Sequence, residues 1–116
     1  MTVEEFYREI RGDYDEVIKR LRKAEKIPRF VSMFLKDTNY AELKAAIEAE
    51  DTEAAFKAAH NLKGVSANLS LSELSRLASE ITEALRGGDM AAAKTMLPPI
   101  SENYNLIVKL SAELEA

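Results

Sequence analysis

Signals that begin and end α-helices recur along the chain, and they constrain its fold more than any other feature. Thr2 with Glu5, and Asp13 with Glu16, have the spacing of a capping box, in which two side chains satisfy free amides at a helix start. Gly12 breaks the chain between these two starts. No segment alternates polar and apolar residues over a useful length, as a half-buried β-strand would. The sequence therefore predicts an all-α fold.

The same kinds of signal place the later helices. Ser70 with Glu73 forms a further capping box, and Gly87 fits the end of the helix that follows. Pro98 and Pro99 cannot donate to a helix ladder, so we expect them to kink or split the last helical region. The predicted helices lie near 3–11 and 14–24, from Pro28 to the turn at 37–39, near 40–50, from Asp51 or Thr52 to about Leu69, from Ser70 to Arg86, and after Asp89. The last of these are long, apolar on one face and joined by short turns, which predicts an antiparallel bundle.

Composition and charge argue against several classes of function. The net charge of −4 disfavours binding to nucleic acid or to an anionic membrane surface. Without cysteine the chain has no disulfide, thiol nucleophile or cysteine-ligated zinc, and a single histidine disfavours a histidine-rich metal site. The longest apolar run, FVSMFL, is too short to cross a bilayer, and the charged N-terminus is no signal peptide. We expect a monomeric protein of the cytoplasm, either free-standing or a cytoplasmic module of a larger protein.

The only histidine, His60, is expected on the outer face of its helix. Successive helix residues turn by about 100°, which places His60 about 160° from Leu62 on the apolar stripe. Gly64 and Ala67 share the outer face, and Lys63 lies about 60° to one side of His60 on the next turn. Glycine costs a helix about 1 kcal/mol, but it removes a side chain that would stand beside the ring. The pattern predicts a docking surface for an anion carried by another macromolecule, with an ordinary surface histidine as the alternative.

Most catalytic mechanisms that use a histidine need further residues, and the sequence does not indicate those residues in this chain. No serine or threonine stands in a sequence relation to His60 that indicates a nucleophilic triad. The acidic residues are spread over polar helix faces, which is typical of a solvated surface, although a two-carboxylate hydrolase remains an open alternative. The GGD turn at 87–89 follows no strand, so it is not a phosphate loop, and we expect no kinase activity. What remains is an imidazole that carries a phosphoryl group, a carrier rather than a stand-alone enzyme.

Residues 60–64, HNLKG, resemble the phosphoacceptor motif H-x-L-K-G of histidine-containing phosphotransfer (HPt) domains. The stretch EDTEAAFKAAHNLKG is similar to the family's approach to the histidine, and LSELSRLASEITEALRGGD is similar to the following helix with its closing R-x-G-D turn. The resemblance covers about residues 28–116. It implies a single HPt domain over 1–116, with a four-helix bundle over 28–116 and accessory N-terminal helices over 1–27.

The resemblance also implies a function and a role for each motif residue. Such domains take a phosphoryl group from an aspartyl phosphate on a response-regulator receiver domain and pass it on in a multistep phosphorelay. His60 would be the phosphoacceptor through Nε2, Lys63 would stabilise the phosphoryl charge, and Gly64 would let the partner approach closely. Magnesium would belong to the receiver, so this chain is expected to hold no cofactor or metal of its own. A hybrid histidine kinase is a second candidate partner, and the larger protein of which this chain could be a module would be such a kinase.

The sequence departs from the family's pattern at two positions. Ser70 stands where the family usually has glycine, and we expect it to preserve the turn by capping the next helix. Thr82 aligns with the Gln or Glu that holds the second nitrogen of the histidine. Because threonine is shorter, we expect Thr82 to orient His60 less firmly, or through water. This departure keeps open a second function, a non-catalytic helical adaptor that binds a receiver or kinase domain without phosphotransfer.

Several neighbours of His60 are candidates for contact with the partner. Phe56 lies one turn before His60, and it is either an apolar anchor for the receiver or covered by another helix of this chain. The other candidates could equally belong to a solvated helix face. They are Lys57, Asn61, Ala67 and Asn68.

Overall fold

The structure of the protein is a computed structural model that describes residues 1–114. No strand occurs among these residues, so the predicted all-α fold is confirmed. The helices are α1 (Val3–Glu9), α2 (Tyr14–Leu21), the short 3₁₀ helix η1 (Ala24–Lys26), α3 (Ile27–Leu35), α4 (Asn39–Glu48), α5 (Thr52–Asn68), α6 (Ser72–Arg86) and α7 (Met90–Ser111).

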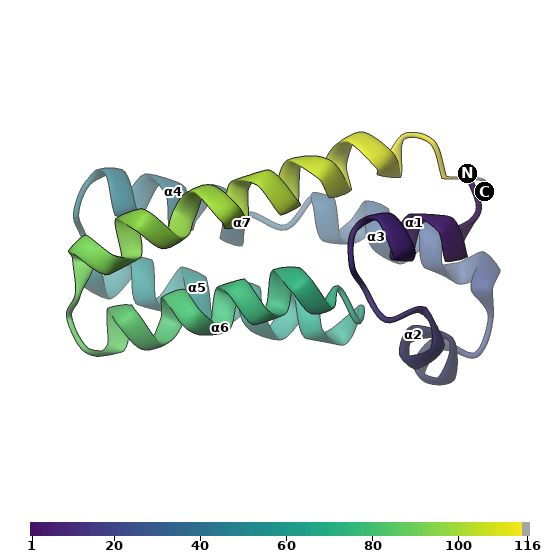
Figure 1. The fold of residues 1–116 in the computed structure, drawn as a ribbon, viewed down its shortest axis with the longest axis horizontal. Helices are drawn as coiled ribbons and strands as arrows, with labels where there is room; N and C mark the ends of the chain where they lie inside the picture. The colour runs from purple at the N-terminus through teal and green to yellow at the C-terminus, as the bar shows by residue number, and fades with distance from the viewer. Residues whose placement is uncertain (115–116) are drawn as a thin grey trace.

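Helices α4 to α7 form the predicted antiparallel four-helix bundle. Each helix packs against the next, and α7 returns to pack against α4 (Figure 1). Helix α3 packs against α7, while α1 and α2 lie at the end of the bundle where the chain begins (Figure 1). The N-terminal amine donates to the carbonyl of Glu113, which ties the start of the chain to the segment after α7. The prediction of short N-terminal helices beside a bundle is confirmed.

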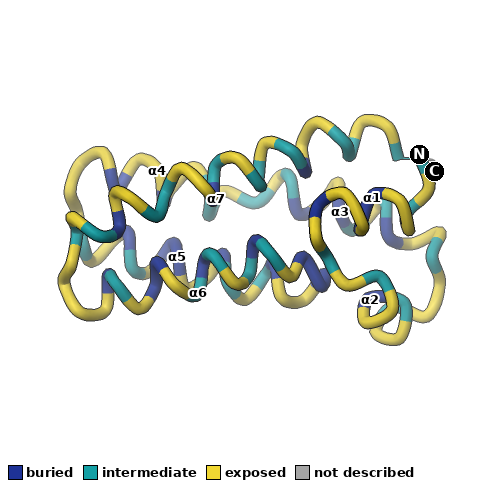
Figure 2. Tube along the Cα trace, viewed as in Figure 1, coloured by how far each residue is buried: buried dark blue, intermediate teal, exposed yellow. Residues whose placement is uncertain are grey.

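The core fills the space between the facing helix stripes, and the outer faces remain exposed (Figure 2). Helix α5 contributes mostly small side chains to this core, which lets its two neighbours approach closely. Larger apolar side chains of the other bundle helices fill the remaining space. Fully buried examples are Leu43, Leu74, Ile81, Ile100 and Ile107. The core uses one side of α5, so the opposite side is available to a partner.

Helix α7 continues through Pro98 and Pro99, so of the two predicted outcomes, a kink or a split of this region, the split is wrong. Each proline removes the hydrogen bond to the carbonyl four residues earlier, on Lys94 and Thr95. All four of these residues are exposed. Water can therefore satisfy the freed carbonyls, and the packing of α7 against α4 and α6 keeps the helix in one piece.

Ser70 does not cap α6, contrary to the prediction. No side chain bonds the first amides of α6, whose N-cap position is Leu71. Ser70 is buried and has φ of 53°, in the left-handed region that favours glycine. It thus adopts the conformation that glycine would supply in the family, and its hydroxyl donates to Glu16 Oε1 at 2.7 Å. Glu73 is bonded by Arg76 instead, and this hydrogen bond lowers the pKa of Glu73.

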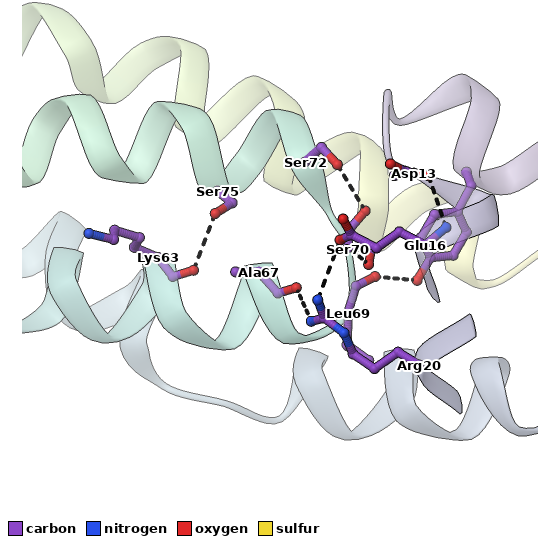
Figure 3. A network of polar contacts seen from close by, with 10 residues as sticks. Asp13, Glu16, Arg20, Lys63, Ala67, Leu69, Ser70, Ser72 and Ser75 are labelled. Carbon is purple, nitrogen blue, oxygen red and sulfur yellow. Dashed lines mark hydrogen bonds and ion pairs between the residues drawn. The ribbon is translucent and has the colours of Figure 1, made fainter. Parts of the chain in front are cut away.

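The N-terminal segment fastens the turn between α5 and α6, in an arrangement that we call the turn clasp (Figure 3). The last carbonyls of a helix have no partner within it and must find one elsewhere. Here one carbonyl at the end of α5 and two in the turn after it accept hydrogen bonds from residues of α1, α2 and the link between them. The bonds run from Tyr7 Oη to the Leu69 carbonyl at 2.6 Å, from Arg20 Nη1 to the Ala67 carbonyl at 2.7 Å, and from the Asp13 amide to the Ser70 carbonyl at 2.9 Å.

Gly12 permits the close approach that the turn clasp needs. A Cβ atom at this position would lie 2.6 Å from Tyr7 Cδ2 and 2.9 Å from the Ser70 carbonyl oxygen. Burial of Tyr7 raises the pKa of its phenol, so the hydroxyl remains a donor to the turn. The accessory helices therefore hold the end of the helix that carries His60.

We expect Ser70→Ala to destabilise the protein more than Ser70→Gly. Both variants lose the bond to Glu16, which contributes about 1 kcal/mol or more because the acceptor is charged. Only glycine relieves the left-handed backbone, which costs another residue about 1 kcal/mol. Urea denaturation of the two variants should therefore give free energies of unfolding that differ by about 1 kcal/mol. Equal values would show that the backbone at residue 70 carries no strain.

Candidate functional site

Helix α5 places His60 on the outer side of the bundle, as the sequence predicts. The Asp51 carboxylate caps the helix by accepting from the Ala54 amide at 3.1 Å. Leu62 is buried on the core side, and this fixes the rotation of the helix about its axis. His60 and Gly64 are both exposed, and a Cβ atom at Gly64 would meet nothing within 4 Å. The imidazole is open to a large partner on the side of Gly64.

Lys63 is a half-buried residue of α5, one turn from His60. Its carbonyl accepts from the hydroxyls of Ser66 and Ser75, while no ion pair in residues 1–114 uses its ammonium group. Lys63 and Ser79 line an open surface pocket, and Arg20 of α2 lines it as well. The ammonium group is thus available to an anion that docks beside His60.

Phe56 stacks against His60 along α5. The ring centroids are 6.0 Å apart with an interplanar angle of 15°, which describes an offset, nearly parallel pair. The guanidinium carbon of Arg86, at the end of α6, lies 5.0 Å from the centroid of the Phe56 ring. Phe56 is half-buried, so it is neither fully covered by the protein nor fully offered to a partner.

Thr82 faces the interior rather than His60. It is 0% exposed, and its hydroxyl donates to the Ala78 carbonyl at 2.6 Å within α6. Within residues 1–114, His60 makes no hydrogen bond to Thr82 or to any other side chain, and its one ring contact is with Phe56. The hydrogen bond by which Thr82 was expected to orient the imidazole is therefore absent from this structure.

The remaining candidates lie on the same side of α5 as His60. Helix geometry places all of them within about 100° of His60 around the axis. Each is exposed: Lys57, Asn61, Ala67 and Asn68. Together with His60 and Gly64 they form a continuous surface along one helix, which we call the α5 surface. The turn clasp borders its end, because Arg20 bonds the Ala67 carbonyl.

The structure adds two arginines that sequence reasoning missed. Arg86 belongs to the R-x-G-D turn at the end of α6, and Arg20 lies in the basic segment of α2. Each arginine lies in a recognisable sequence segment, but that segment does not indicate a contact with α5. Only the tertiary fold places Arg86 over Phe56 and Arg20 at the end of α5.

Among residues 1–114 no group of acidic or histidine side chains is arranged to hold a metal ion. Nor is any helix in that part of the chain long and apolar enough to span a membrane.

Fold and site together define a helical-bundle protein that presents one histidine, flanked by a lysine and a glycine, on an exposed helix face. The family model of the Hpt domain matches residues 29–116, so the chain belongs to the Hpt domain family, whose members carry phosphate on histidine in phosphorelays. The match begins within α3, covers α4 to α7 and includes the whole α5 surface. Comparison with curated proteins and with solved structures gave no match.

Proposed function

We propose that the protein is a phosphorelay intermediate that accepts a phosphoryl group on His60 from an aspartyl phosphate of a receiver domain and passes it on. The observation that carries this proposal is the exposed imidazole beside the cleared position at Gly64. A macromolecular donor must bring its phosphoryl group within bonding distance of the imidazole, so no large side chain can stand beside His60 on the side of approach. Gly64 has no side chain and Ala67 has only a methyl group, so both leave the surface of α5 beside His60 open.

The chemistry requires only the imidazole on this side of the interface. The lone pair of Nε2 attacks phosphorus, and the bond between phosphorus and the aspartyl oxygen breaks, so that aspartate leaves as a carboxylate. The proton on the other ring nitrogen can pass to water, because His60 is exposed. The reverse reaction, with a second receiver, passes the group on.

Lys63 would stabilise the charge of the transferred group. A phosphoryl group carries roughly −1.5 to −2 charges at neutral pH, and a nearby ammonium group offsets part of this. The Mg²⁺ that we expect in the receiver would balance the charge from the other side of the interface. Partner receivers in the cytoplasm are the expected donors, and a hybrid histidine kinase is an alternative source.

Transfer from a purified receiver tests this function directly. The receiver is phosphorylated on its aspartate with a radioactive phosphoryl group, freed of excess donor and mixed with the protein. We expect label on this chain that is labile in acid and stable in base, as a phosphorus–nitrogen bond is. Mass spectrometry of peptides should place it on His60. Absence of such label with every receiver of the source organism would contradict the proposal.

A non-catalytic adaptor is the second candidate, and the position of Thr82 favours it. The Thr82 hydroxyl is bonded within α6, so this position gives His60 none of the support that the family's longer polar side chain provides. An adaptor would bind a receiver through the α5 surface yet take no label. Calorimetric titration beside the transfer assay separates the two candidates, since binding without label indicates an adaptor.

A further inference from the structure

The imidazole of His60 is oriented by an aromatic ring and not by a hydrogen bond. The Phe56 ring lies 6.0 Å away at an angle of 15°, whereas no polar side chain in residues 1–114 bonds either ring nitrogen. Offset stacking of this kind restricts rotation about the bonds that carry the imidazole. It leaves both nitrogens free for a partner and for water.

Phe56 is itself held in place from the neighbouring helix. The Arg86 guanidinium lies 5.0 Å from the Phe56 ring centroid, within the range of a cation–π contact. Arg86 also donates to Glu83 at 3.2 Å, which limits its own movement. Glu83 thus restrains Arg86, which contacts Phe56 across the junction of α5 and α6, and Phe56 in turn contacts His60.

We propose that Phe56, held by Arg86, is the positioning residue of His60 and takes over the task that the family assigns to a polar side chain at the position of Thr82. This inference rests on the proposed function, because an imidazole must be positioned for in-line attack only if it accepts a group. A residue that positions the ring affects the rate of transfer within the complex. A residue that only anchors the receiver affects the concentration needed for binding.

Single-turnover transfer from a phosphorylated receiver distinguishes these roles. At saturating receiver we expect Phe56→Leu to lower the maximal rate about 3- to 10-fold, the range that an aromatic pair contributes. The half-saturating concentration should stay the same. Phe56→Tyr keeps the ring and should keep the rate, while Arg86→Gln should lower it about 2- to 3-fold. Phe30→Leu is the matched control, a half-buried phenylalanine on α3, and should transfer at the wild-type rate.

Proton NMR of the imidazole tests the stacking without any transfer. The His60 ring protons should be shifted by the Phe56 ring current, and this shift should vanish in Phe56→Leu but remain in Phe30→Leu. An unchanged maximal rate in Phe56→Leu, or a change in the half-saturating concentration alone, would overturn the inference while the proposed function stands. If the wild-type protein takes no label, the proposed function fails and the positioning role fails with it. If the wild type takes label but the His60 ring-proton shifts are the same in Phe56→Leu, the inference alone is overturned.

Discussion

Replacing His60 with glutamine is expected to abolish the acid-labile label while leaving the fold unchanged. Glutamine has no nucleophilic ring nitrogen, so the phosphorus–nitrogen bond cannot form. The fold should tolerate the change, because His60 is exposed and no side chain in residues 1–114 is hydrogen-bonded to it. Surface substitutions change the free energy of unfolding by about 0.5 kcal/mol or less, and loss of the stacking with Phe56 costs about 0.5 to 1.5 kcal/mol more. The measurements are transfer from a phosphorylated receiver and urea denaturation of the same preparation.

Asn105→Gln provides the control for this variant. Asn105 is also exposed but lies on α7, outside the α5 surface, and its longer homologue retains the amide. It should accept label as the wild type does. Label of the same acid lability on His60→Gln would place the acceptor elsewhere and refute the assigned role of His60. Loss of label in both variants would show that the loss does not report the missing nucleophile at residue 60.

The parts of the fold that depend on local chemistry could be predicted from the sequence. The Asp51 and Asp89 carboxylates cap α5 and α7 as their positions before apolar stripes indicate. The helical period alone placed His60 opposite Leu62, since the core must take the apolar side of an amphipathic helix. The exposure of the candidate site therefore followed from spacing that spans only a few residues.

The features that depend on distant contacts could not be predicted in this way. Capping chemistry favoured Ser70 as a helix start, but its hydroxyl donates to Glu16 and its backbone is left-handed. Proline chemistry favoured a kink or a split at Pro98 and Pro99, but α7, packed against α4 and α6, is one continuous helix. The family resemblance placed Thr82 beside His60, but its hydroxyl satisfies a carbonyl of its own helix. In each case a tertiary contact or a nearby backbone acceptor decided the conformation, and the local sequence signal did not.

Gly64→Leu is expected to stabilise the protein and to block transfer from the receiver. A Cβ atom at this position meets nothing within 4 Å, so the new side chain extends from the α5 surface without a clash. Leucine is the better helix former, by up to about 1 kcal/mol. The leucine side chain would also fill the space beside the His60 imidazole through which the receiver must approach. Displacing the reacting atoms by about 1 Å can cost 100-fold in rate, so we expect a loss of at least about that size.

Phosphoramidate, a small phosphoryl donor, separates obstruction of the receiver from damage to the imidazole. It should label Gly64→Leu about as fast as the wild type, because a small donor can approach His60 from its open sides. Ala91→Leu is the control for an added surface leucine, since Ala91 is exposed on α7, which packs against α4 and α6. It should transfer normally with the receiver. Normal transfer to Gly64→Leu would mean that the receiver does not approach over Gly64, and the helix would then have no functional reason to keep a glycine that weakens it.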